Sequence, residues 1–511
     1  MSPTRDKSSL HREFSILILC AAVWVGCPDT GLFVSGVSEI LSCDDGDPCT
    51  TDDQRSVDRC VGDFICPAYE ASTLVGIDPL PDGNALSVAD FNRDGIPDLA
   101  IGRFPTDTSV IFVGRPGGYT PQFLSERHEA VLWSDLDIDS DLDLIGSGAA
   151  PPASVVYYRR GLNRFERLAT LGERGAAACS VVFDQNRDGW NDILVFETRD
   201  AAPSLNLSAG VSPVSFLPPS RLSTGFLLGA ACAATDVDAD GHSDIFLNTD
   251  QGGLLLRGSR EGFVRDERFE LPVVLDPSRD IGGAGTRFAD FNGDGRIDGY
   301  FGGGVGQLDS LYLSEASGDF AISTELGSTE TLTLGVDAGD VDHDGDVDLV
   351  VATSDGALTL HRNNGVGVFS PVDLRNLLAP TSMPRVPTLA DMDRDGDLDM
   401  VILSSPGPNA LLRNRTNDEK WVKIRLEGRG PPASPRDAIG SQVTLLGVDD
   451  RVLGIRETGY PSGLGQQLSH EAHFGLAADD VGQVLSVSVR FPSGTVQRVS
   501  VSAATLAVVT E

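Results

Sequence analysis

The sequence has few positive charges. Its 511 residues include 39 Lys and Arg against 75 Asp and Glu, a net charge of −36, and only three of the cations are lysines. Such an excess of negative charge repels phosphate backbones and anionic lipids, which excludes nucleic acids and acidic membranes as first-choice partners. With 41% hydrophobic residues, however, the chain can bury real cores, so it is not a disordered acidic tail.

Histidine is also scarce, at seven residues, which leaves little material for general-base catalysis. The sequence contains no G-x-S-x-G, no HExxH, no P-loop and no Gly-rich dinucleotide turn. His470 and His473 lack the i, i+4 spacing of a zincin, and we expect His242 and His343 to be exposed in acidic loops. The protein is therefore predicted not to be an enzyme.

Long apolar runs are absent except near the N-terminus. The run Phe14 to Gly26 spans 13 residues, whereas about 20 are needed to cross a bilayer. We predict that residues 1–27 form a secretory signal peptide and that the protein is secreted or attached to a cell surface, such as a bacterial outer surface. The triplet ending at Cys27 faintly resembles a lipobox, although Trp24 stands where a Leu is expected, so a lipid anchor at Cys27 stays open.

Half of the eight cysteines fall within 24 residues. They follow a C-x5-C-x10-C-x5-C pattern that does not match a paired CxxC zinc site, so two disulfides are the better interpretation in a secreted chain. Residues 28–66 are thus predicted to be a linker and a Cys-rich module. The three possible connectivities stay open for Cys43, Cys49, Cys60 and Cys66.

An acidic pattern, D-x-[DN]-x-D-[GS]-x-x-D, occurs seven times. Its copies start 45, 49, 52, 54, 50 and 51 residues apart. Short, β-branched apolar runs precede and follow each copy, and neither run offers the ten residues of a helix. A turn and at least one further strand come next, which makes three or four strands in each repeat. This arithmetic predicts an all-β, seven-bladed β-propeller over residues 67–415.

The seventh repeat lacks an outer strand, so we predict that residues from about 64 to 75 complete its sheet and close the ring. Cys179 and Cys232 precede the third and fourth acidic loops on strands of neighbouring blades. A disulfide between the blades and two separate small core residues are equally compatible with this placement.

The spacing of the acidic loops is that of oxygen ligands around a hard cation. Side chains at positions 1, 3, 5 and 9 and the carbonyl at position 7 offer oxygens, while the glycine at position 6 permits a positive-φ turn. An EF-hand is excluded because position 12, Ile101 in the first loop, is not Glu. We predict up to seven Ca²⁺ ions, one in each loop, that stabilise the blades.

The predicted ligands, with the carbonyl donor of position 7 last in each loop, are Asp90, Asn92, Asp94, Asp98 and Ile96; Asp135, Asp137, Asp139, Asp143 and Asp141; Asp184, Asn186, Asp188, Asp192 and Trp190; Asp236, Asp238, Asp240, Asp244 and His242; Asp290, Asn292, Asp294, Asp298 and Arg296; Asp340, Asp342, Asp344, Asp348 and Asp346; Asp391, Asp393, Asp395, Asp399 and Asp397. The three loops with Asn at position 3 have less charge, so we expect weaker binding there. Ser140 replaces the glycine of the second loop, at a cost on the order of 1 kcal/mol if the turn is kept.

The seven loops, each followed by an apolar strand, resemble the FG-GAP or VCBS repeats of integrin-type propellers. That resemblance implies that each loop joins the first two strands of a blade. After residue 415 the acidic loops stop. Alternating residues predict strands at 421–426, 441–446, 452–457, 484–491 and 495–501, and so a small β-sandwich-like domain over residues 416–511. Its motifs WVKIRLEG, RDAIGSQV, GYPSGLGQQ, HFGL and VSVRFPSG resemble, in that order, the ASPIC/UnbV domain of proteins similar to cartilage acidic protein 1.

We expect a monomeric, Ca²⁺-stabilised propeller that binds an extracellular protein or glycan through loops of one rim. Two alternatives stay open: a carbohydrate-active enzyme, such as a Ca²⁺-assisted polysaccharide lyase, and a purely structural matrix component. The segment from Tyr460 to Gly465 is either a ligand loop or a turn.

Overall fold

The computed structural model describes most of the chain after residue 49. The described residues are 50–56, 59–64, 69–72, 83, 85–102, 108–148, 154–161, 164–171, 177–197, 204–211, 215–222, 229–249, 252–269, 285–304, 306–327, 330–416, 418–462 and 466–511. The predicted signal peptide, Cys27, Cys43, Cys49 and Cys66 lie outside these ranges, and the side chain of Cys60 is not described. No described helix is long and apolar enough to cross a membrane.

The chain forms two compact units, residues 1–66 and 67–511. In the first unit, β1 (Thr50–Ser56) pairs with β2 (Arg59–Phe64) as an antiparallel hairpin. The second unit contains the propeller and the C-terminal domain.

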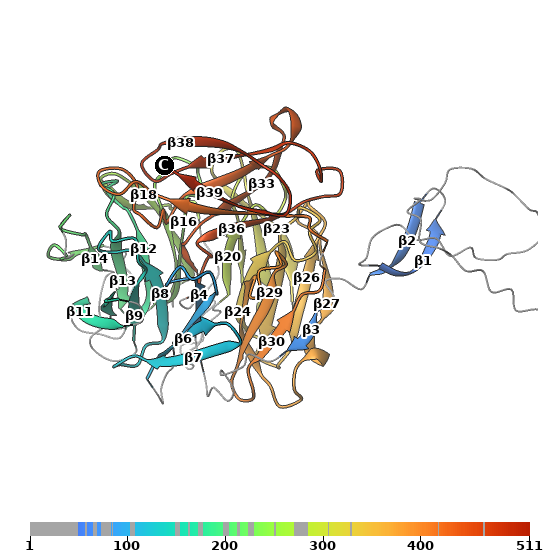
Figure 1. Ribbon diagram of the computed structural model, residues 1–511, viewed down its shortest axis with the longest axis horizontal. Coiled ribbons are helices and arrows are strands. Elements are labelled where there is room, and N and C mark those ends of the chain that lie inside the picture. The colour runs from blue at the N-terminus through green and yellow to red at the C-terminus, as the bar shows by residue number, and fades with distance from the viewer. Residues whose placement is uncertain are drawn as a thin grey trace, which may run out of the picture. The chain divides into compact units, whose positions relative to one another are not determined.

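Seven four-stranded antiparallel sheets follow one another along the second unit (Figure 1). The first four are β4 (Ala85–Ala89), β5 (Asp98–Gly102), β6 (Val110–Arg115) and β7 (Gly118–Phe123); β8 (Ala130–Ser134), β9 (Asp143–Ser147), β10 (Ser154–Arg159) and β11 (Phe165–Leu171); β12 (Ala177–Phe183), β13 (Asp192–Glu197), β14 (Ser204–Asn206) and β15 (Ser220–Arg221); and β16 (Gly229–Thr235), β17 (Asp244–Thr249), β18 (Gly252–Ser259) and β19 (Gly262–Arg265).

The remaining three are β20 (Thr286–Ala289), β21 (Asp298–Phe301), β22 (Asp309–Ser314) and β23 (Phe320–Leu326); β24 (Thr333–Gly339), β25 (Asp348–Thr353), β26 (Leu358–Asn363) and β27 (Phe369–Asp373); and β28 (Pro384–Ala390), β29 (Asp399–Ser404) and β30 (Ala410–Arg413) with β3 (Glu70–Ser72). A short 3₁₀-helix, η1 (Arg375–Leu377), follows the sixth sheet.

The sheets close into a ring. The first strand of each sheet contacts the first strand of a neighbouring sheet, and β28 of the last sheet contacts β4 of the first. Strand β3 pairs antiparallel with β30, with Ala71 opposite Leu412, which confirms the closing strand predicted between residues 64 and 75. The fold is therefore the seven-bladed β-propeller expected from the repeats.

The cores of the propeller lie between adjacent blades. Phe91 and Ile111 of the first blade share one buried cluster with Trp133 and Val155 of the second. The rings of Phe91 and Trp133 stack with their centroids 5.1 Å apart. The same construction explains why strands that are buried on both faces carry nearly continuous apolar residues, as in Val110–Arg115.

Two sheets form the C-terminal domain. One contains β36 (Glu471–Gly475), β31 (Trp421–Glu427) and β39 (Thr505–Thr510), and the other contains β33 (Val452–Glu457), β32 (Gln442–Leu446), β37 (Leu485–Arg490) and β38 (Val496–Val501). The 3₁₀-helix η2 (Val448–Asp450) joins β32 to β33. Val422 and Phe474 of the first sheet share a buried cluster with Val443 and Val487 of the second, as in a small β-sandwich.

Of the segment from Tyr460 to Gly465, the structure describes residues 460–462, which pair with residues 466–467 in a short hairpin that contacts the propeller. Its strands, β34 (Pro461–Ser462) and β35 (Gln466–Gln467), contact the innermost strands β4, β8, β12 and β16. The Gln467 side chain accepts a hydrogen bond from the Trp133 amide (2.7 Å) and donates one to the Trp133 carbonyl (2.8 Å). The hairpin of β34 and β35 therefore lies at the centre of the ring.

Cys179 of β12 and Cys232 of β16 form a disulfide between the third and fourth blades, with their Cα atoms 6.0 Å apart. Of the two interpretations left open by the sequence, the structure shows the disulfide. It links neighbouring inner strands of the ring.

Candidate metal centre in the acidic loops

Each acidic loop joins the first strand of a blade to the second, as Asp90 to Asp98 joins β4 to β5. Two positions in every loop have positive φ. At position 6, φ lies between 76° and 101°, and Ser140 keeps this conformation at 76°. At position 4, which the sequence pattern leaves free, φ lies between 56° and 69°, and the β-branched Ile138 is among these residues. The seven loops thus share one backbone turn, whatever residue occupies it.

Hydrogen bonds within the loop hold the carboxylates of positions 1 and 5 toward its interior. In the fourth loop, the Gly241 amide donates to Asp236 (2.9 Å) and the His242 amide donates to Asp240 (2.7 Å). The second of these bonds, from position 7 to position 5, occurs in all seven loops, at 2.7–3.1 Å.

The aspartate at position 9 ties the loop to its sheet. Its two oxygens accept hydrogen bonds from the amide at position 2 and from an amide at the end of the third strand. In the fourth loop, Asp244 accepts from Val237 (3.2 Å) and Gly258 (2.7 Å). All seven loops have this pair of bonds. Since these aspartates are at most 1% exposed, position 9 has a structural role that the ligand pattern did not predict.

In four loops the structure brings three predicted carboxylate ligands together. One oxygen from each lies within 4.8 Å of the others in the groups Asp135, Asp137 and Asp143; Asp236, Asp238 and Asp244; Asp340, Asp342 and Asp344; and Asp391, Asp393 and Asp395. The other three loops have Asn at position 3 and form no such group among the described residues. These four clusters are candidate metal sites.

Burial raises the pKa values of several loop carboxylates. Desolvation is the largest cause of a rise to about 8 for Asp135 and about 9 for Asp344, and neighbouring aspartates raise both pKa values further. At position 9, desolvation raises the pKa of Asp244 to about 8, although the Gly258 amide opposes the rise. Ionised carboxylates are therefore costly in these loops unless a cation lies among them.

Several carboxylate oxygens have no partner to offset this cost. One oxygen each of Asp236, Asp340 and Asp342 is buried and has no hydrogen-bond partner among the described residues. Buried oxygens that lack donors fit a cation better than they fit a closed hydrogen-bonded turn. The residues present therefore fit a hard, oxygen-ligated dication.

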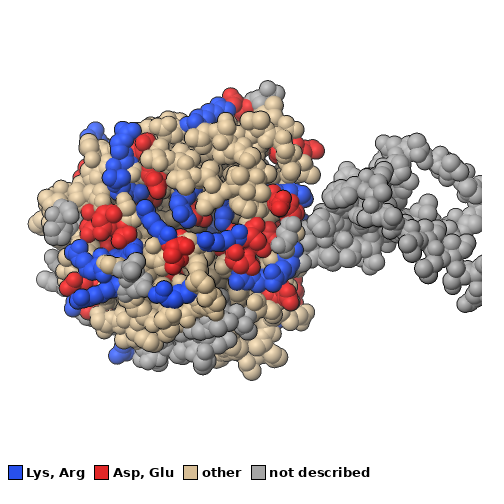
Figure 2. Space-filling view, in the orientation of Figure 1, with Lys and Arg blue, Asp and Glu red and all other residues tan. Residues whose placement is uncertain are grey.

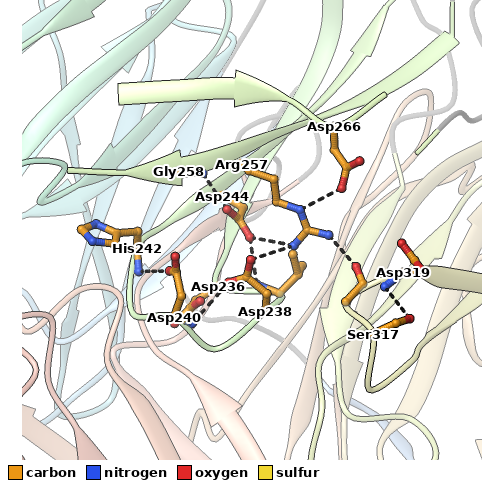
Figure 3. Close-up of polar contacts among 12 residues, drawn as sticks. Asp236, Asp238, Asp240, His242, Asp244, Arg257, Gly258, Asp266, Ser317 and Asp319 are labelled. Atoms are coloured by element: carbon orange, nitrogen blue, oxygen red, sulfur yellow. Dashed lines mark hydrogen bonds and ion pairs between the residues drawn. The ribbon is translucent and has the colours of Figure 1, made fainter. Parts of the chain in front are cut away.

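Arginines reach the loops that have Asp at position 3. Nitrogens of Arg160, Arg257, Arg362 and Arg413 lie 3.8, 3.5, 2.6 and 3.2 Å from the position-3 carboxylates. In Figure 3, Arg257 extends from β18 toward Asp238 and Asp244 on one side and Asp266 on the other. On the face visible in Figure 2, acidic and basic side chains are interleaved rather than segregated.

The C-terminal domain rests on these loops, at one end of the blades (Figure 1). Asp437 accepts hydrogen bonds from the Asp135 amide (2.8 Å) and from Asn191 (2.8 Å). Glu457 accepts one from the Asp236 amide (2.9 Å). Acidic side chains of the second domain thus satisfy backbone amides at position 1 of two loops.

Cations of the C-terminal domain also contact position 1. Arg490 donates to Asp236 (2.6 Å) and Lys423 to Asp391 (2.5 Å). The sequence pattern could not identify these residues, because they lie tens to hundreds of residues from their partners. Nothing in their local sequence marks them as contacts of an acidic loop.

The expectation that His343 is exposed was wrong. Its side chain is fully buried and its Nδ1 lies 2.7 Å from Asp418 Oδ1, in the segment that leads to the C-terminal domain. His242 is half-buried. Burial of His343 follows from the docking of the C-terminal domain, because His473 of β36 lies beside it with ring centroids 5.5 Å apart.

Models of known families match the propeller and the C-terminal domain separately. The FG-GAP-like repeat matches residues 236–301 and 340–402, the FG-GAP repeat matches residues 83–108, and the ASPIC and UnbV model matches residues 430–510. The chain contains FG-GAP repeats and an ASPIC and UnbV domain. The matched FG-GAP segments contain five of the seven acidic loops, the first and the fourth to seventh, with strands that flank them. No curated protein matches the chain, and the resemblance to cartilage acidic protein 1 stays a prediction.

Solved structures similar to the FG-GAP propeller share little sequence with it. BBS1N in complex with ARL6DN is 12% identical, with a TM-score of 0.47 over 68% of this chain and 97% of that one. A lectin of Agrocybe aegerita that recognises non-reducing terminal N-acetylglucosamine is 16% identical, with a TM-score of 0.43 over 66% and 91%. The exotype rhamnogalacturonan lyase YesX is 14% identical, with a TM-score of 0.40 over 65% and 61%. Such likeness carries no inference about activity.

Proposed function

We propose that this protein is a secreted or surface-attached, Ca²⁺-stabilised binding module for an extracellular protein or glycan, and that it is not an enzyme. The observation that carries the proposal is the buried carboxylate cluster that recurs between the first two strands of the blades. Calcium would be held by the oxygens of positions 1, 3 and 5, the carbonyl of position 7 and the carboxylate of position 9. It would supply the positive charge that these buried groups need.

The donor set favours Ca²⁺ over other metals. Every loop offers carboxylate and carbonyl oxygens, and three loops add the amide oxygen of an Asn at position 3. No thiolate or imidazole is a predicted ligand, since His242 supplies its carbonyl, and Ca²⁺ takes six to eight such oxygens in flexible geometry. Mg²⁺ requires a tighter octahedron. Position 9 ties every loop to its sheet, including the three Asn loops through Asp98, Asp192 and Asp298. An ion bound in a loop would therefore stabilise the blade to which that loop belongs.

Docking of the C-terminal domain limits where a partner binds. Lys423, Asp437, Glu457 and Arg490 contact the loop-bearing end of the blades. The partner surface is therefore assigned to parts of the propeller that this domain leaves uncovered, and calcium acts on binding indirectly, through the rigidity of the blades. The sequence led us to expect a partner at the loops of one rim. The rim that carries the acidic loops is covered by the C-terminal domain, so we assign the partner to another part of the propeller.

The test is binding by the purified full chain in Ca²⁺ and in EDTA, on a glycan array and in a pull-down from native medium or surface extract. We expect one retained partner in Ca²⁺ and loss of that partner in EDTA. Asp240→Asn removes a predicted carboxylate ligand from the fourth loop and should weaken retention of the partner in Ca²⁺. Asp355→Asn, in an exposed turn outside the loops, is the matched control and should leave retention unchanged. Release of unsaturated oligosaccharides from an acidic polysaccharide would overturn the proposal in favour of a lyase.

A further inference from the structure

Three metal-binding side chains that supply no predicted calcium ligand converge in one place. His343 is at position 4 of the sixth loop, Asp397 is at position 7 of the seventh loop, and Asp418 lies between β30 and β31. One ligand atom from each lies within 4.8 Å of the others. Position 4 supplies no calcium ligand in the predicted pattern and position 7 supplies only its carbonyl. These three side chains are therefore not used by the calcium sites.

The hydrogen bond of His343 uses one nitrogen of its ring, and the other nitrogen faces Asp397. Nδ1 lies 2.7 Å from Asp418 Oδ1. In the neutral ring the proton is on Nδ1, which donates to Asp418, and the lone pair is on Nε2. Nε2 is buried, has no hydrogen-bond partner among the described residues, and lies 3.9 Å from Asp397 Oδ1. That distance exceeds a hydrogen bond. Nitrogen and oxygen ligands of one tetrahedral zinc ion lie about 3.4 Å apart, so these two atoms need to approach each other by only about half an ångström to share an ion.

A second imidazole borders the same place. His473 Nε2 lies 2.8 Å from the Gly396 carbonyl and donates to it, which leaves the lone pair on Nδ1. That Nδ1 is also buried without a hydrogen-bond partner in the described parts of the chain. The His473 and His343 ring centroids are 5.5 Å apart. Imidazole next to carboxylate is a donor set for first-row transition metals, whereas Ca²⁺ prefers oxygen alone.

We propose that a transition-metal dication of the Zn²⁺ class binds here, with His343 Nε2 and the Asp397 carboxylate as ligands. Asp418 holds the opposite nitrogen of His343 and so orients the ring, as carboxylates beside metal-bound histidines do. His473 is the next donor. Because the contributors come from two blades, the connecting segment and β36, the ion clamps the C-terminal domain to the propeller.

Zinc binding by the full chain tests this proposal. The protein is freed of transition metals and saturated with Ca²⁺, and Zn²⁺ is then titrated by calorimetry, with Co²⁺ absorption as a second probe. We expect one Zn²⁺ bound to each chain, loss of that site in His343→Gln, and a 10- to 100-fold weaker site in Asp418→Asn. His361→Gln is the matched control, since His361 is another buried imidazole whose Nδ1 has no partner among the described residues, and it should bind Zn²⁺ like the wild type.

Two results would overturn the proposal: no Zn²⁺ binding by the Ca²⁺-loaded wild type, or equal affinity in wild type and His343→Gln. Either would mean that His343 is a partner of Asp418 without a metal-binding role. If His343→Gln fails to fold, the zinc affinity of Asp418→Asn and the nitrogen-ligand signature in the Co²⁺ spectrum decide whether His343 binds the metal. Calcium binding is measured before zinc is added, so failure of the calcium proposal is seen separately.

Discussion

The acidic loops with Asp at position 3 differ from those with Asn in the residue that approaches them from the third strand. In the fourth, sixth and seventh blades an arginine, Arg257, Arg362 or Arg413, directly precedes the residue whose amide binds position 9. In the blades with Asn the same place holds Val113, Leu207 or Leu313. The second blade also has Asp at position 3, but the arginine that approaches it, Arg160, comes directly after the third strand.

With its third-strand arginine counted, an Asp loop has the same net charge as an Asn loop over positions 1, 3, 5 and 9. Positions 1, 3, 5 and 9 carry three aspartates in an Asn loop and four in an Asp loop, and the arginine offsets the fourth. The expectation that Asn loops bind calcium more weakly was based on their smaller charge. With the arginines present that basis disappears, and we now predict similar affinities in both classes.

Removal of calcium should have the largest effect. A ligand at 100 times its Kd stabilises the folded state by about 2.7 kcal/mol for each site, so loss of several ions should lower the Tm by at least about 10 °C. Calorimetry in Ca²⁺ and in EDTA measures this shift, and restored Ca²⁺ should reverse it. An unchanged melting curve would remove the calcium assignment from both classes of loop.

Substitution of the position-9 aspartate should destabilise the protein equally in the two classes of loop. Asp192→Ala in an Asn loop and Asp244→Ala in an Asp loop each leave two buried amides without their acceptor. We expect a loss of about 2–4 kcal/mol in the free energy of unfolding for each variant, measured by urea denaturation. Asp355→Ala, in an exposed turn, is the control. A much smaller loss in one class would mean that its aspartate is held for the ion rather than for the loop.

Removal of an arginine should convert an Asp loop into a tighter site. Arg257→Met removes the cation beside Asp238 and Asp244 and leaves Arg490, at Asp236, as the remaining cation in contact with the fourth loop among those described above. The aspartates then repel one another more without an ion and attract Ca²⁺ more strongly. We expect about tenfold higher affinity at one site, equivalent to about 1.4 kcal/mol, by calcium titration calorimetry. Arg268→Met, which removes a cation from Asp266 outside the loop, should leave calcium binding unchanged.

The smallest effect is expected from the reverse exchange. Asn292→Asp adds a carboxylate to a loop whose third strand has Leu313 in place of arginine. Calcium affinity should rise a few-fold, while the calcium-free protein loses about 0.5–1 kcal/mol of stability. Adding Leu313→Arg should cancel both changes. A double variant that behaves like Asn292→Asp alone would contradict charge balance between these two positions.

The sequence predicted the repeat architecture because its signals are local. Seven acidic patterns at blade spacing, short apolar runs around each, and a missing outer strand led to the propeller and to its closure by β3. Alternating residues also predicted β31, β32, β33, β37 and β38. The pattern missed β36 and β39, and it missed the positive φ of position 4, which is occupied by residues such as Ile138 and Arg93 that do not mark a left-handed turn.

Other features depended on distant residues. The Cys179–Cys232 disulfide required knowledge that two inner strands lie side by side. The hairpin at Tyr460 carried turn residues, but its place in the centre of the ring is set by contacts with four blades. The burial of His343 likewise follows from a domain that begins more than seventy residues later.

By itself, the sequence determined the positive-φ turn at position 6 and the oxygen donors of each acidic loop, because both are encoded within nine consecutive residues. Only the tertiary structure decided the charge balance and accessibility of those loops. Arginines of the third strand and side chains of the C-terminal domain reach the carboxylates across the fold. Coulombic interaction and desolvation depend on distance in space, and distance along the chain does not report it.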